Sequence, residues 1–150
     1  METRVVSMEI RVIKTNSEQE TVALAVEFSQ TLSNCAIIAI EGELGAGKTC
    51  FVRGLCEGLG GDPRQVSSPT FTIMQEYDVA GERRLVHVDA YRLSGEAELA
   101  SIGWDELLED PAAIIAIEWP SRIKDAIPSS VVNVTIDHLD PTTRSIHIQM

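Results

Sequence analysis

The residues GELGAGKT, from Gly42 to Thr49, constrain the fold of this 150-residue chain more than any other stretch. They fit the pattern G-x-x-x-x-G-K-[ST] completely, and that pattern requires a strand that runs into a glycine-rich loop and then into a helix. The run Ala36–Ile40 before them is continuously apolar, as in a strand buried on both faces. Apolar residues then recur at helical spacing, at Phe51, Val52, Leu55, Cys56 and Leu59. The sequence therefore predicts an α/β fold.

The six letters AIIAIE occur twice, at 36–41 and at 113–118. The flanks of the two copies share no similarity, so we do not favour a duplication. Buried parallel strands use few residue types, and this explains the match more simply. In open α/β sheets, ligands collect outside the carboxyl ends of the strands. Both copies would deliver the residues that follow them to that edge of the sheet.

Other segments complete the predicted sheet and its cover. Ser17 and Glu20 are spaced as a capping box, and the helix after them carries Leu24, Phe28 and Leu32 on one stripe. We further predict an edge strand at 8–13, a loop at 62–69, strands at 71–79 and 85–91, a helical segment at 96–109 interrupted by Gly103, and a hairpin from 131–136 and 145–148. The predicted architecture is a three-layer P-loop NTPase-like fold. Its central sheet is mostly parallel with antiparallel additions and a C-terminal hairpin, and residues 1–150 form a single domain.

The glycine-rich loop suits phosphate binding. Its glycines let successive backbone N–H groups point inward, and the start of the following helix adds partial positive charge. In this pattern Lys48 places an ammonium group on the outer phosphates of a nucleotide, and the Thr49 hydroxyl suits Mg²⁺. The alternative is a glycine-rich turn that binds nothing. The predicted nucleotide-binding residues run through the loop: Glu43, Leu44, Gly45, Ala46, Gly47, Lys48, Thr49 and Cys50.

Two carboxylates follow predicted strands and could face this loop. Glu118 ends the second apolar run, and Asp89 ends the segment Leu85–Val88. Acidic groups at such strand ends can hold Mg²⁺ directly or through water, and we favour Glu118 as the direct ligand beside Thr49. Glu41 occupies the matching place in the first copy, but there the chain turns at once into the loop, so we interpret Glu41 as structural or solvated. Glu118 and Asp89 could also be solvated carboxylates without a metal.

Composition and charge limit the partners and the cellular location that we expect. The formal net charge is −11 and the basic residues are scattered, so strong direct binding to nucleic acid is not expected. The three cysteines, Cys35, Cys50 and Cys56, form no CxxC pair, which argues against a disulfide framework or a zinc site. The first residues contain no signal-peptide core, and no apolar run approaches the roughly 18 residues that cross a bilayer. We expect a cytoplasmic protein with no membrane partner.

Four motifs together resemble one known family. GELGAGKT, SSPTF at 67–71, HVDAYR at 87–92 and IEWP at 117–120 are similar, in order and spacing, to the TsaE (YjeE) family over nearly the whole chain. Its members are small bacterial P-loop ATPases needed to make threonylcarbamoyladenosine in tRNA. The first motif alone is generic, whereas the set is specific. The chain departs from the family at Cys50, where a second Thr is usual, and at Gly61-Asp62, where an apolar residue is more usual.

The resemblance implies a role for each matching residue. Lys48 and the loop backbone would bind the phosphates of ATP, and Thr49 and Glu118 would hold Mg²⁺. Asp89 would act near the γ-phosphate, and Thr70 would lie in a switch-like segment that senses it. Lys48, Asp89 and Thr70 are therefore our candidate catalytic residues.

Other matching residues have simpler alternatives. The resemblance places Trp119 beside the nucleotide, but Trp119 and Tyr91 could be core residues. The segment 68–70 could be a turn that leads into a strand. His87 is more readily explained as a packed strand histidine than as a catalytic base.

Three functions compete at this point. The resemblance implies an ATPase that works with the TsaD and TsaB proteins and meets tRNA only indirectly. A small-molecule P-loop kinase is the alternative, although the acidic segment 95–110 would make a poor phosphate lid. A nucleotide-gated binding module without turnover is the third. Neither Arg92 nor Arg122 is clearly placed to reach the γ-phosphate, so we expect slow hydrolysis by the isolated chain.

Overall fold

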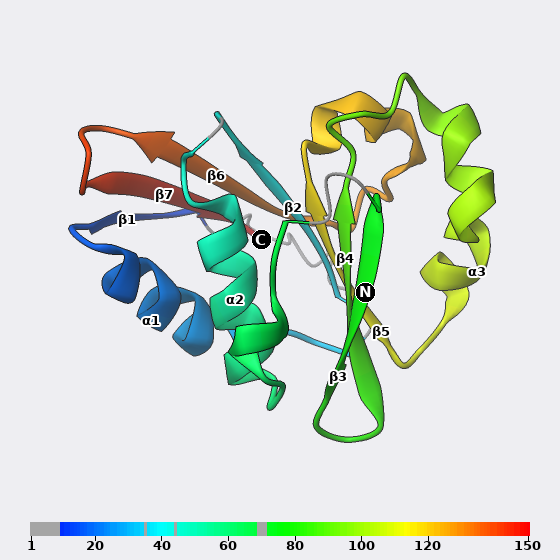
Figure 1. Ribbon diagram of the computed structural model, residues 1–150, viewed down its shortest axis with the longest axis horizontal. Coiled ribbons are helices and arrows are strands. Elements are labelled where there is room, and N and C mark those ends of the chain that lie inside the picture. Colours follow the sequence, from blue (N-terminus) through cyan, green and yellow to red (C-terminus); the bar gives the residue numbers. More distant parts are fainter. Residues whose placement is uncertain (1–9, 35, 44, 69–71) are drawn as a thin grey trace, which may run out of the picture.

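A seven-stranded sheet with the strand order β1-β7-β6-β2-β5-β4-β3 runs through the described part of the chain (Figure 1). The computed structural model describes residues 10–34, 36–43, 45–68 and 72–150. The strands are β1 (Ile10–Thr15), β2 (Ile37–Gly42), β3 (Met74–Val79), β4 (Arg83–Asp89), β5 (Ala113–Glu118), β6 (Val132–His138) and β7 (Arg144–Gln149). The α-helices are α1 (Glu18–Ser29), α2 (Lys48–Gly58) and α3 (Trp104–Glu109), and the 3₁₀ segments are η1 (Pro63–Gln65), η2 (Glu96–Ile102) and η3 (Pro120–Ala126).

The sheet is parallel at its centre and antiparallel at its margins. The four central strands β6, β2, β5 and β4 pair in parallel. β3 joins β4 antiparallel at one edge, and β7 and β1 extend β6 antiparallel at the other. The predicted parallel centre, antiparallel additions and C-terminal hairpin are therefore confirmed, and the two AIIAIE copies are neighbouring strands.

Helices cover both faces of the sheet and make three layers (Figure 1). Helices α1 and α2 lie side by side on one face, where Phe28 and Phe51 pack over Ile38 and Ile40. On the other face α3, η2 and η3 cover Ile115 and its neighbours. Because both of their faces are covered, β2 and β5 are the strands with continuous apolar runs, as the sequence predicts.

Local signals in the sequence fix several element ends. Ser17 is the N-cap of α1 and its hydroxyl accepts a hydrogen bond from the backbone N–H of Glu20 at 3.1 Å. The Glu20 carboxylate accepts in return from the backbone N–H of Asn16. The predicted pairing of Ser17 with Glu20 at the start of the helix is therefore confirmed, with the return bond made to Asn16, the residue before the N-cap. The α2 helix ends before Gly60, whose N–H bonds the carbonyl of Glu57 as in a Schellman motif.

Some predicted boundaries are wrong, for local reasons. The edge strand predicted at 8–13 continues to Thr15, and residues 8 and 9 lie outside the described residues. The predicted loop at 62–69 contains the turn η1. The strand predicted at 85–91 ends at Asp89, because its carboxylate accepts the backbone N–H of Tyr91 at 2.9 Å and turns the chain. The strand predicted from residue 71 begins at Met74, after Ile73 takes a φ of +67°.

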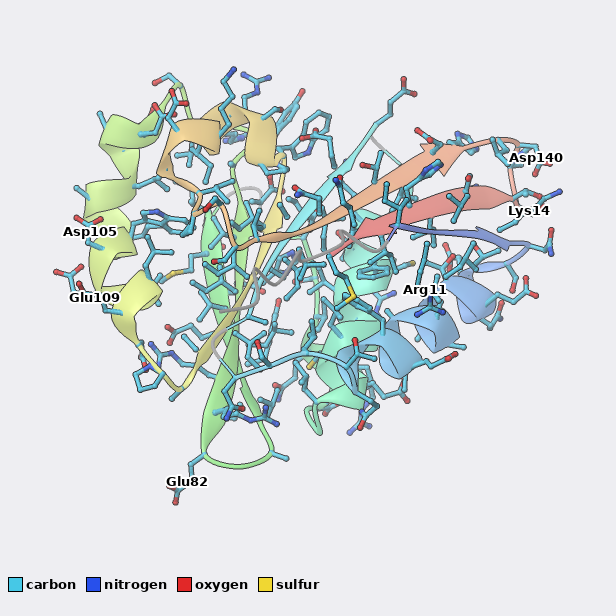
Figure 2. The ribbon with its side chains drawn as sticks, turned by 180° about the vertical axis from the view of Figure 1, so that it is seen from behind. Arg11, Lys14, Glu82, Asp105, Glu109 and Asp140 are labelled. Carbon is cyan, nitrogen blue, oxygen red and sulfur yellow. The ribbon has the colours of Figure 1, made fainter. Side chains whose placement is uncertain are left out.

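Several charged side chains of the helices and turns lie at the periphery of the molecule. Asp105 and Glu109 on α3 and Glu82 at the β3–β4 turn point away from the sheet (Figure 2). Within the described residues, no helix has the length and apolar character needed to cross a membrane.

Candidate functional site

The glycine-rich loop joins the end of β2 to the start of α2. Gly45 and Gly47 have φ values of +78° and +105°, which only glycine adopts without strain. Gly47 is also the N-cap of α2, so no side-chain oxygen occupies the first N–H groups of the helix from that position. This geometry suits the binding of an anion at the helix N-terminus.

Lys48, the first residue of α2, lies folded over the loop. Its side chain is buried, with 5% of the residue exposed, and Nζ donates to the carbonyl oxygens of Gly42 and of Glu43, the latter at 3.0 Å. Nζ also lies 4.1 Å from the centre of the Trp119 ring, a cation–π contact. Burial lowers the pKa of the Lys48 ammonium below its ordinary value, whereas nearby carboxylates, Glu118 foremost, raise it.

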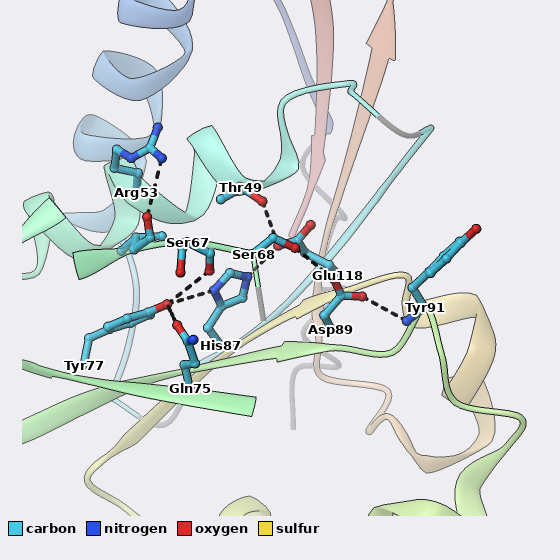
Figure 3. A network of polar contacts seen from close by, with 11 residues as sticks. Thr49, Arg53, Ser67, Ser68, Gln75, Tyr77, His87, Asp89, Tyr91 and Glu118 are labelled. Atoms are coloured by element: carbon cyan, nitrogen blue, oxygen red, sulfur yellow. Dashed lines mark hydrogen bonds and ion pairs between the residues drawn. The ribbon is translucent and has the colours of Figure 1, made fainter. Parts of the chain in front are cut away.

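Thr49 and Glu118 meet above the strand ends. The Thr49 hydroxyl donates to Glu118 Oε2 at 3.2 Å, and Glu118 is 3% exposed (Figure 3). Asp89 is the register partner of Glu118 on the adjacent strand β4, and it is equally buried. Parallel pairing thus places both carboxylates at the same edge of the sheet, as the sequence predicts.

Asp89 is tied to two backbone segments. One oxygen accepts the Tyr91 N–H, and the other lies 3.3 Å from the Ser68 hydroxyl, which donates to it. Ser68 lies directly before the Thr70 segment. Thr70 itself and Leu44 of the loop fall outside the described residues, so their predicted roles stay predictions.

One cavity of about 370 Å³ collects most of the predicted residues. It is lined by Glu18, Gly45, Gly47, Lys48, Thr49, Cys50, Ser68, Asp89, Tyr91, Glu118 and Trp119. The backbone carbonyl of Glu43 accepts a hydrogen bond from Lys48 Nζ, and Ala46 is fully buried within the loop. The structure therefore brings together both carboxylates, Trp119 and those of the predicted loop residues that it describes.

Cys50 and Trp119 are both half-buried. Burial raises the pKa of the Cys50 thiol, whose sulfur lies 3.7 Å from an Arg53 nitrogen. Trp119 takes a φ of +57°, in the left-handed region, directly after Glu118. Its ring packs on Tyr91 with centroids 5.0 Å apart, and the Arg122 guanidinium lies 5.6 Å from the Tyr91 ring.

Sequence reasoning missed two residues at this site. His87 is fully buried, as expected of a packed strand histidine, but its Nε2 lies 2.5 Å from Glu118 Oε2. Its place two residues before Asp89 on one strand puts both side chains on the same face, and that spacing is the signal available in the sequence. Arg144 donates from Nε to the Ala46 carbonyl at 2.8 Å and from a terminal nitrogen to the Gly45 carbonyl at 3.3 Å. No local pattern predicts a contact over 98 residues.

The donor set suits Mg²⁺. Thr49 and Glu118 present oxygen atoms at one point, with Asp89 alongside. Across the described ranges, no group of three His, Cys, Asp or Glu side chains gathers that could hold a metal on its own. Mg²⁺ is commonly held by one or two carboxylates together with substrate phosphates and water, and this arrangement fits that pattern.

Comparison with known proteins gives the same family at three levels. The family model for threonylcarbamoyl adenosine biosynthesis protein TsaE matches residues 15–146. The chain belongs to the TsaE family. The tRNA threonylcarbamoyladenosine biosynthesis protein TsaE of Rickettsia conorii is 36% identical over 129 residues, which cover 86% of this chain and 72% of the relative. The TsaE protein of Bacillus subtilis is 35% identical, covering 89% of this chain and 81% of the relative.

A solved structure agrees with the TsaE assignment. The crystal structure of Bacillus subtilis YdiB superposes with a TM-score of 0.75 at 27% sequence identity, covering 97% of this chain and 88% of that one. The resemblance stated from the four motifs and the predicted α/β fold are both confirmed.

Proposed function

We propose that this TsaE-family chain is the ATP-binding and ATP-hydrolysing component of the machinery that makes threonylcarbamoyladenosine in tRNA, and that residues 1–150 act as one P-loop domain in the cytoplasm. The observation that carries the proposal is the meeting of four groups in one cavity. Lys48 and Thr49 at the start of α2 face Glu118 and Asp89 at the ends of two parallel strands. This is the arrangement that phosphoryl-transfer sites of the P-loop type require.

Different residues would bind the phosphates, hold the metal and position the attacking water. The loop backbone and the N-terminus of α2 hold phosphate oxygens, and Lys48 exchanges its loop carbonyls for the outer phosphates. Thr49 and Glu118 would hold Mg²⁺, which when bound neutralises charge that develops on the transferred phosphoryl group. Asp89, fixed by the Tyr91 N–H, would orient the attacking water or support the Mg²⁺ site from beside it. Thr70 senses the γ-phosphate.

The proposal includes a slow basal rate. An arginine that reaches the transferred phosphoryl group is worth about 10³–10⁵ in rate. Arg122 lies instead beside the Tyr91 ring, and Arg144 holds carbonyl oxygens of the loop. We propose that TsaD and TsaB complete the site by ordering the Thr70 segment or by supplying a missing group.

Steady-state release of phosphate from ATP, with the chain alone and with TsaD and TsaB, tests the proposal. We expect slow turnover alone and acceleration in the complex, with Thr70→Ala losing the acceleration. Fast turnover that the partners leave unchanged would favour a free-standing ATPase. Transfer of the γ-phosphate to a small acceptor, detected by mass spectrometry, would establish the alternative, a small-molecule kinase.

Contact with tRNA is proposed to be indirect. With a net charge of −11, the chain repels a phosphate backbone, so partners must supply basic surface. In a mobility-shift assay at moderate salt, the pure chain should leave tRNA unshifted. Tight and salt-sensitive binding by the chain alone would overturn this part of the proposal.

A further inference from the structure

A chain of buried polar contacts runs from β3 through β4 to Glu118 on β5 (Figure 3). The Tyr77 hydroxyl lies 3.3 Å from His87 Nδ1, and His87 Nε2 lies 2.5 Å from Glu118 Oε2. His87 is 0% exposed, and Tyr77 and Glu118 are also buried. Both nitrogens of the ring therefore face a polar partner inside the sheet layer.

The chemistry of these groups fixes the orientation of the ring. A carboxylate in its ionised form only accepts hydrogen bonds, and the ring tautomer that suits it carries the proton on Nε2. The Tyr77 hydroxyl also lies 2.8 Å from Gln75 Oε1 and 3.4 Å from the Ser67 carbonyl, and its one proton can be donated to one of these acceptors or to Nδ1 at a time. With both nitrogens engaged, the imidazole can neither flip nor rotate without breaking a contact.

Two contacts of Glu118 meet the same carboxylate oxygen. The Thr49 hydroxyl and His87 Nε2 both meet Oε2. Oε1 is the oxygen that neither contact uses. A carboxylate held in this way keeps its orientation before any cation arrives, and such outer partners of metal ligands strongly affect metal affinity.

We propose that His87, oriented by Tyr77, is a positioning residue that presents Glu118 to Mg²⁺ and so sets the metal requirement of the nucleotide site. The inference rests on the proposed function, because it assumes that Glu118 holds Mg²⁺. The inference goes beyond the proposed function because it assigns His87 and Tyr77 to the site. Because Tyr77 also contacts the Ser67 carbonyl, the same contacts link Glu118 to the segment that leads to Thr70.

Titration of a non-hydrolysable ATP analogue by calorimetry, with Mg²⁺ and with a chelator, tests this role. In His87→Leu, the Mg²⁺ concentration for half-maximal binding of the analogue should rise about 10- to 100-fold, the usual effect of losing a partner of a metal ligand. Binding without metal should stay within about twofold, because the loop and Lys48 are untouched. His87→Gln keeps an N–H donor near the position of Nε2 and should recover most of the metal affinity.

Two matched variants separate positioning from packing. Val86→Ala, next to His87 on β4 and also fully buried, should lower the melting temperature and leave the Mg²⁺ requirement unchanged. Tyr77→Phe keeps the aromatic ring and removes one hydroxyl, so it should raise the Mg²⁺ requirement about two- to tenfold, the worth of one hydrogen bond. In a Glu118→Gln background, His87→Leu should add no further loss, because the two changes remove one interaction.

The outcomes separate the proposed metal site from the positioning role of His87. If the natural chain shows no Mg²⁺-dependent gain in analogue binding, the proposed metal site is wrong and the inference fails with it. If that gain is present and His87→Leu leaves it intact, or reduces metal-free binding equally, only the positioning role is wrong. Should His87→Leu fail to fold, an unchanged Mg²⁺ requirement in Tyr77→Phe would overturn the role.

Discussion

The two AIIAIE copies have the same six residues and lie side by side as β2 and β5, yet their final glutamates have different surroundings. The pairing is offset by one residue, so that Ile40 of the first copy, and not Glu41, lies opposite Glu118. Because side chains alternate along a strand, an offset of one residue sends equivalent positions to opposite faces of the sheet. Glu118 faces α2 and Thr49, whereas Glu41 faces η3.

The consequences differ for each carboxylate. Glu118 is buried and meets Thr49 and His87. Glu41 is half-buried and accepts the backbone N–H of Ser121 at 3.3 Å, which agrees with its interpretation as a structural residue. Register against neighbouring elements, and not the residues of the strand, therefore decides which copy places its carboxylate beside Thr49.

The largest effect is expected at Lys48, in the loop that comes after the first copy. Lys48→Ala removes the ammonium group at the start of α2 and should lower ATP turnover by at least about 10²–10³-fold, as for loss of a transition-state donor, with strongly weakened nucleotide binding. Phosphate release and calorimetry measure the two losses. Lys124→Ala, an exposed lysine on η3, is the matched control and should behave as the natural chain. Unchanged hydrolysis by folded Lys48→Ala protein would remove Lys48 from the site.

The second prediction contrasts the two glutamates directly. Glu118→Gln should weaken Mg²⁺-dependent nucleotide binding about 10- to 100-fold and leave metal-free binding nearly unchanged, because it removes charge without volume. Glu41→Gln, the equivalent change in the first copy, should alter neither by more than about twofold. Parallel titrations with and without Mg²⁺ give both values. Equal losses in the two variants would contradict the distinction drawn from the register.

The third prediction concerns Gly42, the residue that follows the first copy. A Cβ on Gly42 would lie 2.8 Å from the Ile136 carbonyl oxygen and 3.2 Å from the Ala46 Cβ, so Gly42→Ala forces backbone to move beside the loop. We expect a loss of about 1–3 kcal/mol in the free energy of unfolding, measured by chemical denaturation. Gly95→Ala is the control, since an added Cβ there has open space, and it should change stability by less than about 0.5 kcal/mol. Similar losses in both variants would show that the close approach at Gly42 is unimportant.

The smallest expected effect is a spectroscopic one that joins the two copies. Trp119 follows the second copy, and its ring lies over Lys48, which follows the first. Nucleotide binding draws Lys48 toward phosphate and should change the fluorescence of Trp119. Trp119→Phe should abolish the change and Trp104→Phe should preserve it, because Trp104 is buried with its indole N–H on the Ala126 carbonyl. A change that survives in Trp119→Phe would make Trp104 the reporter.

Much of the fold could be predicted because its signals are local. The capping box at Ser17 and the interruption at Gly103 depend on residues within a turn of one another. The end of β4 was predicted two residues late, since the Asp89 carboxylate captures the Tyr91 N–H and competes with the ladder. Apolar periodicity carries no information about such a side-chain bond.

By itself, the sequence determined the parallel centre of the sheet, the glycine-rich loop and the pair of strand-end carboxylates, because buried β-branched runs and glycine placement follow from short-range sterics and burial. Only the tertiary structure decided the offset between β2 and β5, the contacts of His87 with Tyr77 and Glu118, and the hold of Arg144 on the loop carbonyls. These depend on how separate strands come into register, and side chains 10 to 98 residues apart meet only after the whole sheet has packed between its two helical layers.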